Sequence, residues 1–240
     1  MKQVVNIEWH GQLAYDTAWD WQKEAVAALT NDPTQADKFL LLEHPPTYTL
    51  GRRGKLEHLL LDETALAEQG FTVRWVDRGG DITYHGPGQL VGYPIMNLKR
   101  LYALRGYDLP DLHGYLRDLE EVIIRALAEF GINSWRYEGY TGVWVDTPGG
   151  AEKIAAIGVK ISKDGISSHG FALNVNPDLT HFGHIIPCGI RDHGVTSMAR
   201  VLERPLPTTA LLQPIVNAFQ QIFDVTPVGS ITEIESTSER

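Results

Sequence analysis

Short hydrophobic runs separated by polar turns predict several β-strands along the chain, with helices between some of them. Runs of strand length occur at residues 4–9, 39–44, 47–51, 71–77, 153–162 and 166–176, and residues 134–146 are typical of a hairpin. Apolar residues recur at helical spacing over 14–30, 62–69, 108–130 and 208–223. Because strands and helices do not alternate regularly, the pattern predicts an α/β (α+β) fold with a mixed β-sheet flanked by helices.

Two of these helices carry their own start and stop signals. Residues 62–69 have Asp62 as the expected N-cap and Gly70 as the stop. In the helix over 14–30, Trp21 is expected on the apolar face with the alanines at helical spacing, and Gly131 is expected to end the longest helix.

Composition indicates one globular domain. The chain has 240 residues, is 43% hydrophobic and shows neither an internal repeat nor a linker, so a single domain is expected over 1–228, with a flexible tail over 229–240. The formal net charge of -9 disfavours nucleic-acid binding. The sequence has no apolar run long enough for a signal peptide or a membrane span, which favours a cytoplasmic protein without membrane association.

The most glycine-rich segment lies at 78–98, RGGDITYHGPGQLVGYPIMNL, and predicts two short strands around a His-Gly-Pro-Gly turn. Glycine allows positive φ angles and close approach of backbone to a ligand. A ligand-binding loop and a tight hairpin corner therefore fit the spacing equally well. His85 lies beside the turn, a position that favours a cleft.

Cys188 is the one cysteine in the sequence and stands between proline and glycine in IIPCGI. Burial as a small hydrophobe is the common fate of such a residue. A nucleophile is the alternative, and an unperturbed thiol with a pKa near 8.5 is only about 3% thiolate at pH 7. A neighbouring lysine or histidine would supply the positive charge that a reactive thiolate requires.

Lys153 is the candidate partner, at the start of the strand KIAAIGVKIS. A period of two puts it on the same face as Ala155, Ile157 and Val159, with Lys160 on the other face. A lysine on an apolar face is a plausible general base, although a lysine at the end of a strand more often extends to water. A bulge at Gly158 would also change the face.

Other chemistries fit less well. His169, His181, His184 and His193 occur around Cys188 in the sequence, but their spacing matches no standard zinc site. The sequence contains no Gly-x-Ser-x-Gly motif of a serine hydrolase.

Five blocks of the sequence, in order, resemble the lipoyl(octanoyl) transferase family. They are HPPTYTLGRRG at 44–54, RGGDITYHGPGQLVGYPIMNL at 78–98, KIAAIGVKIS at 153–162, HGFALNVNPDL at 169–179 and PCGI at 187–190. The resemblance implies the fold of the biotin/lipoate protein ligase catalytic domain. It also implies an acyltransferase that moves octanoyl from octanoyl-acyl carrier protein to the specific lysine of lipoyl domains.

The resemblance further implies a role for individual residues. Cys188 would carry the acyl thioester, and Lys153 would lower its pKa and shuttle protons. The substrate would contact Arg78, Gly79, Gly80, Asp81, Ile82, Thr83, Tyr84, His85, Ala156, Ile157, Gly158, His169, Gly170 and Phe171. No ATP or metal would be required, because the donor carries the acyl group on phosphopantetheine. The acceptors would be lipoyl domains of 2-oxoacid dehydrogenase complexes and the glycine cleavage H protein.

Three alternatives remain open from the sequence. An ATP-dependent lipoate–protein ligase of the same fold would need no cysteine, and an amidotransferase would relay octanoyl between lipoyl domains. A non-catalytic module that binds a carrier protein would leave Cys188 buried. The sequence does not determine the preferred acyl length, the preferred acceptor or the oligomeric state.

Overall fold

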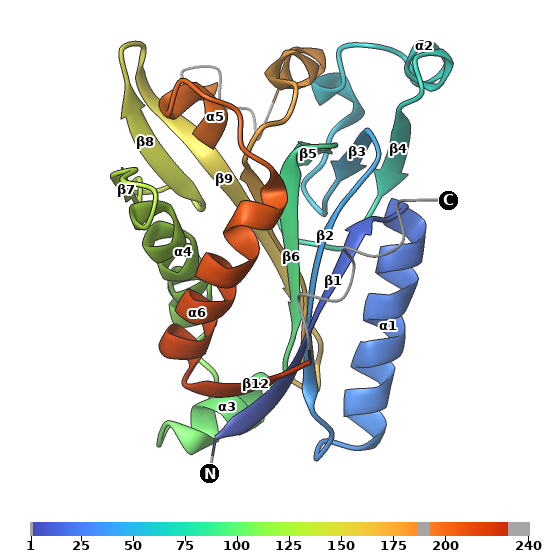
Figure 1. Cartoon of the computed structure of the whole chain (residues 1–240). Helices are drawn as coiled ribbons and strands as arrows, with labels where there is room; N and C mark the ends of the chain where they lie inside the picture. The colour runs from blue at the N-terminus through green and yellow to red at the C-terminus, as the bar shows by residue number, and fades with distance from the viewer. Residues whose placement is uncertain (1, 187–192, 230–240) are drawn as a thin grey trace, which may run out of the picture.

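The computed structural model describes residues 2–186 and 193–229, and its strands form two sheets (Figure 1). Within this part of the chain, the larger sheet has nine strands in the order β12-β1-β2-β6-β10-β9-β8-β7, with β11 beside β9. Its strands are β1 (Gln3–Gln12), β2 (Asp37–Glu43), β6 (Gln89–Ile95), β7 (Ser134–Trp135), β8 (Val143–Thr147), β9 (Gly150–Ile161), β10 (Ser167–Asn174), β11 (Gly194–Val195) and β12 (Val225–Val228). The smaller sheet has the order β4-β3-β5, from β3 (Thr47–Leu50), β4 (Thr72–Trp75) and β5 (Ile82–His85). Both parallel and antiparallel pairs occur, so the predicted mixed sheet is confirmed.

Helices cover both faces of the large sheet (Figure 1). The helical segments are α1 (Tyr15–Asn31), η1 (Leu56–His58), α2 (Glu63–Glu68), α3 (Leu98–Leu104), α4 (Leu112–Ala128), η2 (Leu179–His184), α5 (Met198–Val201), η4 (Thr208–Leu211) and α6 (Leu212–Phe223). Helix α1 packs on one face, whereas α3, α4 and α6 pack on the other. Among the helices that the structure describes, none is long and apolar enough to cross a membrane.

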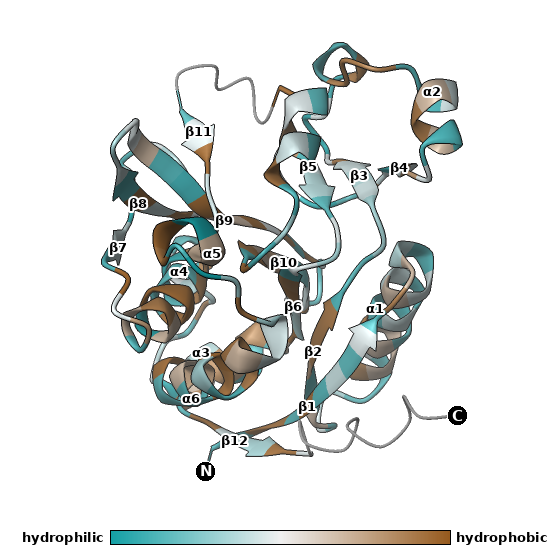
Figure 2. Ribbon diagram, turned by 45° about the horizontal axis from the view of Figure 1, so that its top comes forward, coloured by the Kyte–Doolittle hydropathy of each residue, from teal (hydrophilic) through white to brown (hydrophobic). Residues whose placement is uncertain are grey.

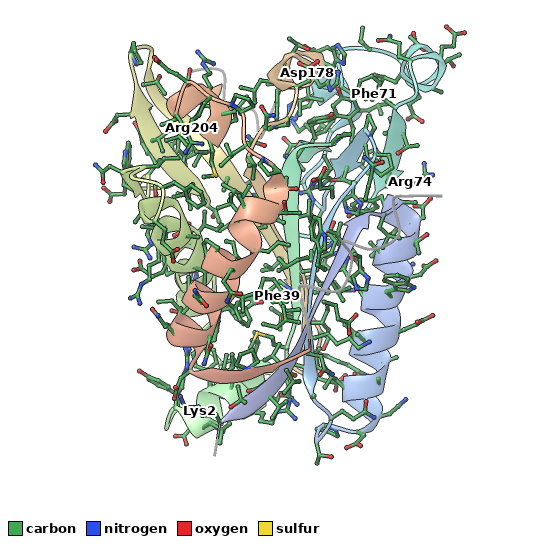
Figure 3. The ribbon with its side chains drawn as sticks, viewed as in Figure 1. Lys2, Phe39, Phe71, Arg74, Asp178 and Arg204 are labelled. Atoms are coloured by element: carbon green, nitrogen blue, oxygen red, sulfur yellow. The ribbon has the colours of Figure 1, made fainter. Side chains whose placement is uncertain are left out.

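The main core lies between the sheet and helices α4 and α6. Phe39 of β2 stacks on Phe219 of α6 with ring centroids 4.3 Å apart, and Phe39 lies near the centre of the molecule in Figure 3. Strand β2 is coloured largely as hydrophobic in Figure 2, in agreement with the burial of Phe39 to Leu42. Such an apolar strand is expected where both faces of a sheet are covered by helices.

Helix ends follow the capping chemistry of the sequence. The Asp62 carboxylate accepts a hydrogen bond from the Ala65 N–H at 2.9 Å, which confirms Asp62 as the N-cap of α2. The longest predicted helix begins at Leu112 rather than at 108, because the Asp111 carboxylate caps it through the Gly114 N–H at 2.9 Å.

The apolar face predicted for α1 is partly wrong. Trp21 is 37% exposed, and Gln22 beside it is buried. Gln22 faces inward because its side-chain oxygen accepts a hydrogen bond from the backbone N–H of His169 at 2.7 Å. A polar contact made by tertiary packing therefore moves the buried stripe by one residue.

The His-Gly-Pro-Gly turn connects the two sheets. Strand β5 pairs with β3 in the small sheet, whereas β6 pairs with β2 and β10 in the large sheet. The hairpin-corner interpretation is therefore wrong, although both predicted strands are present. Gly88 in this turn has a φ of +81° and lies against the backbone of Asn176, so a side chain here would collide with that segment.

A β-bulge in β9 determines where Lys153 points. Trp144 pairs with Lys153 and its neighbour Val143 pairs with Ala155, which leaves Ile154 as the extra residue. Ile154 and Ala155 are both fully buried in the main core. Residues paired directly across two strands share a face, so Lys153 lies with Trp144, away from that core. The predicted face for Lys153 is wrong, because the bulge occurs at Ile154 rather than at Gly158.

Candidate active site

A cavity of about 460 Å³ lies between strands β9 and β10 and the segment around 78–85. Most of the residues that the resemblance implicates line it. They are Arg78, Gly79, Gly80, Asp81, Ile82, Thr83, His85, Lys153, Ala156, Ile157, Gly158, His169, Gly170 and Phe171. Three blocks that are distant in sequence are therefore brought to one cavity.

Backbone contacts hold the glycine-rich segment against the sheet. The Gly79 N–H donates to the Val159 carbonyl of β9 at 2.9 Å. The buried Arg78 guanidinium donates to the Thr49 carbonyl at 2.7 Å, which fixes the same segment to the small sheet. A Cβ on Gly158 would lie 3.0 Å from the Gly79 carbonyl oxygen, so the glycine permits this close approach. Because the Gly79 N–H is already engaged, it is not a donor for a reaction intermediate.

Lys153 lies in the cavity lining at the end of β9 where β11 is paired. Its Nζ donates to the Thr141 carbonyl at 3.2 Å and stands 4.8 Å from the centroid of the Trp144 ring. Val195 of β11 pairs with Lys153, and the Ile186 N–H donates to the His58 carbonyl at 2.9 Å. Cys188 lies outside the described residues, between Ile186 and His193.

A group of polar aromatic residues that the sequence did not single out surrounds His85. Tyr15 and Tyr93 line the cavity, and the Tyr15 and His85 rings stack with centroids 5.8 Å apart. The His44 Nδ1–H donates to the Leu13 carbonyl at 2.7 Å, so Nε2 accepts from the Tyr93 hydroxyl at 2.8 Å. Burial lowers the pKa of His44 to about 4, lowers that of His85 well below its usual value and raises that of Tyr15 to about 12. These groups are therefore uncharged at neutral pH.

His169 is held in an unusual conformation at the cavity wall. It is buried, and its φ of 56° lies in the left-handed region that few side chains adopt. Its Nε2 pairs with Asp77 at 2.7 Å, and the other oxygen of Asp77 accepts from Lys160 at 2.5 Å. The hydrogen bond from His169 and the contact with Lys160 hold the pKa of Asp77 well below its usual range. Asp77 immediately precedes the RGG motif, and that proximity is the only sequence signal for it.

Tyr84 differs from the other implicated residues, because it does not line the cavity. Its hydroxyl contacts His181 Nδ1 at 2.7 Å within the cluster that packs against the small sheet. Among residues 2–186 and 193–229, no three His, Cys, Asp or Glu side chains are grouped as metal ligands. His181 and His184 are neighbours, while His169 and His193 contact other parts of the structure.

Comparisons with known proteins identify the family. Residues 14–220 match the family described as the lipoyl protein ligase A/B catalytic domain. An octanoyltransferase of Rubrobacter xylanophilus is 49% identical over 88% of this chain and 90% of its own length. The chain belongs to the octanoyltransferase family. It is accordingly an acyltransferase, and the recognition made from the five sequence blocks is confirmed.

Solved structures with the same fold are much more distant from this octanoyltransferase-family chain in sequence. A chain from the bi-partite lipoate protein ligase and its E2 lipoyl domain of Thermoplasma acidophilum gives a TM-score of 0.73 at 16% identity, covering 97% of this chain and 88% of that one. The biotin protein ligase of Aquifex aeolicus gives 0.51 at 14% identity, covering 91% and 70%. The predicted ligase-like catalytic fold is confirmed.

Proposed function

We propose that this octanoyltransferase-family enzyme transfers an octanoyl group from octanoyl-acyl carrier protein to the lysine of a lipoyl domain through a thioester on Cys188. The observation that carries the proposal is the position of Lys153. Lys153 lines the same cavity as residues of the 78–85, 156–158 and 169–171 segments. The R. xylanophilus relative is named an octanoyltransferase, and the Thermoplasma ligase structure includes a lipoyl domain, which supports the same class of acceptor.

The reaction has two acyl transfers. In the first, the Cys188 thiolate attacks the carrier thioester, a new C–S bond forms and the bond to phosphopantetheine breaks, with Lys153 donating a proton to the departing thiolate. In the second, the acceptor amine attacks the acyl-enzyme, a C–N bond forms and the C–S bond to Cys188 breaks. Neutral Lys153 takes the proton of the amine. Neither step consumes a nucleotide or needs a metal ion.

The chain on each side of Cys188 supports this assignment. The backbone N–H of Ile186, two residues before Cys188, donates a hydrogen bond to the His58 carbonyl. The His58 Nδ1 in turn contacts the carboxylate of Asp81, a residue of the cavity wall, at 2.6 Å. Val195, seven residues after Cys188, pairs with Lys153. The described residues that precede and follow Cys188 in the chain are therefore both held beside the cavity.

Intact mass after mixing the enzyme with octanoyl-acyl carrier protein tests the proposal. The wild-type protein should gain one octanoyl group without added ATP or metal, and a lipoyl domain should then remove it as an amide. Cys188→Ser should gain none, and Lys153→Ala should acylate far more slowly, because the thiol loses its charged neighbour. An equal adduct on Cys188→Ser excludes the thioester, and a strict requirement for ATP favours the ligase alternative.

A further inference from the structure

Four aromatic rings gather beside the Lys153 end of the cavity. Tyr137, Tyr140, Trp144 and His193 have mutual centroid distances of 4.9 to 5.8 Å. We refer to these four residues as the aromatic rim. Trp144 is buried, whereas Tyr137, Tyr140 and His193 are partly exposed. Tyr140 also lines the cavity, together with Gly139 and Thr141. The rim therefore faces both solvent and the site.

The rim already binds one ammonium group. Lys153 Nζ stands 4.8 Å from the Trp144 centroid, and ring faces attract cations through their quadrupole. The partly exposed rings of Tyr137 and Tyr140, which meet edge to face at 82°, are more accessible from outside. A second ammonium that entered along them would arrive beside Lys153.

Besides Lys153, exposed carboxylates lie next to the rim residues in sequence. Glu138 is exposed between the two tyrosines in sequence, and Asp146 is exposed in the following strand. The neighbouring Arg136 is matched by Glu120 and Glu121 at 3.1 and 2.6 Å. By contrast, the two arginines that line the cavity, Arg53 and Arg78, lie in the segment between β3 and β5. A phosphodiester would be attracted toward these arginines, whereas the ring faces of the rim and the carboxylates next to it in sequence would attract a primary ammonium.

We propose that the aromatic rim is the entry site for the acceptor's lysine ammonium, which passes over Tyr137 and Tyr140 to reach Lys153. This inference rests on the proposed function for its acceptor but concerns a site outside the segments that the family resemblance implicates. Two ammonium groups held close together favour loss of a proton from one of them, and the free amine is the nucleophile that acyl transfer requires. The rim thus couples recognition of the lysine to its activation.

The second half of the reaction isolates this effect. Enzyme acylated with octanoyl-acyl carrier protein is mixed with either N-acetyl-lysine methylamide or dithiothreitol, a thiol without an ammonium group. Loss of the octanoyl adduct is followed by mass. Tyr140→Leu and Tyr137→Leu should slow transfer to the amine by roughly fivefold to thirtyfold, the range of about 1 to 2 kcal/mol expected for a cation–π contact. Transfer to the thiol should not change. Tyr140→Phe keeps the ring and should retain amine transfer, and Tyr107→Leu, at a 60% exposed tyrosine outside the cavity lining, is the matched control.

Equal slowing with both nucleophiles, or no slowing with either, overturns the proposal. A titration with unacylated protein provides a test that does not depend on turnover. The ε-methylene protons of N-acetyl-lysine methylamide should shift upfield with the wild-type enzyme and not with the Tyr137→Leu, Tyr140→Leu double variant. The uncharged norleucine analogue should show no such shift. If the wild-type enzyme forms no acyl adduct, the proposed function fails, and this titration alone then decides the rim: an absent or charge-independent shift overturns it.

Discussion

His44 makes the stability of this enzyme sensitive to acid, and the structure gives the size of the effect. The imidazole is fully buried between the Leu13 carbonyl and the Tyr93 hydroxyl, and burial lowers its pKa to about 4. In the unfolded chain the same group titrates near 6.5. The unfolded state therefore binds the proton more readily, so the contribution of this group falls as pH decreases from about 6.5 toward about 4.

The magnitude follows from the separation of the two pKa values. Between about pH 7.5 and pH 4.5 the wild-type protein should lose about 2 to 3 kcal/mol through His44, at about 1.36 kcal/mol per pH unit below 6.5. For a chain of this length that corresponds to roughly 5 to 10 °C in Tm. Asp37 acts in the opposite direction, because burial raises its pKa to about 6. The contribution of Asp37 is the same in the wild-type protein and in a variant that lacks only His44, so it cancels when the two proteins are compared.

The assay is urea unfolding of the wild-type protein and His44→Gln at both pH values. His44→Gln should be less stable at pH 7.5, because it lacks the hydrogen bonds of the imidazole to Leu13 and Tyr93. The difference in the free energy of unfolding between the two proteins should shrink by about 2 to 3 kcal/mol at pH 4.5. His113→Gln replaces an exposed histidine on α4 and should follow the wild-type curve. If the wild-type and His44→Gln curves stay parallel, His44 is not held neutral by burial and the reasoning is refuted.

Two further predictions concern a glycine of the cavity lining and a buried carboxylate. Gly170→Ala should destabilise the protein by about 3 kcal/mol in urea unfolding, since its Cβ would lie 2.1 Å from the Gly92 carbonyl oxygen. The control Gly183→Ala should cost far less, because the space around Gly183 is open. Equal losses of stability in the two variants would contradict the packing argument. Glu120→Gln should cost about 3 kcal/mol, because the buried carboxylate receives Arg117, Arg136 and the Gly142 N–H at 2.6, 3.1 and 3.0 Å. Glu121→Gln, at a partly exposed carboxylate, should cost under about 1 kcal/mol, and a similar loss in both variants would show that burial does not govern the difference.

Local signals in the sequence predict most of the elements, because those signals act over a few residues. The cap at Asp62 and the positive φ of Gly70 and Gly131 are properties of single turns and are present as expected. The start of α4 is displaced only as far as its actual cap, Asp111. Where a buried stripe depends on a distant partner, as at Gln22 and His169, periodicity alone gives the wrong residue.

The residues of the cavity also differ in whether local sequence signals or distant contacts bring them there. Its glycine-rich wall is visible in the sequence because the turn residues are concentrated in one segment. Tyr15 is an isolated position in an ordinary helix pattern, and tertiary packing alone brings it to the site. Tyr93 lies within the glycine-rich segment and Asp77 just before it, but neither residue stands out from the surrounding strand pattern. Tyr84 lies in the recognised segment, yet the alternation of strand β5 turns it toward His181 instead of the cavity.

The bulge at Ile154 connects the folding pattern to the chemistry. Strict alternation from Ala155 back along β9 would direct Lys153 toward the core that α4 and α6 cover, where burial would oppose its charge. Because of the extra residue, Ile154 and Ala155 both lie in that core, and Lys153 lies on the opposite face of the strand with Trp144. Both hydrophobic burial and an accessible amine are then satisfied within three consecutive residues. The register of β9 against β8 therefore decides that Lys153 lines this cavity instead of pointing into the core.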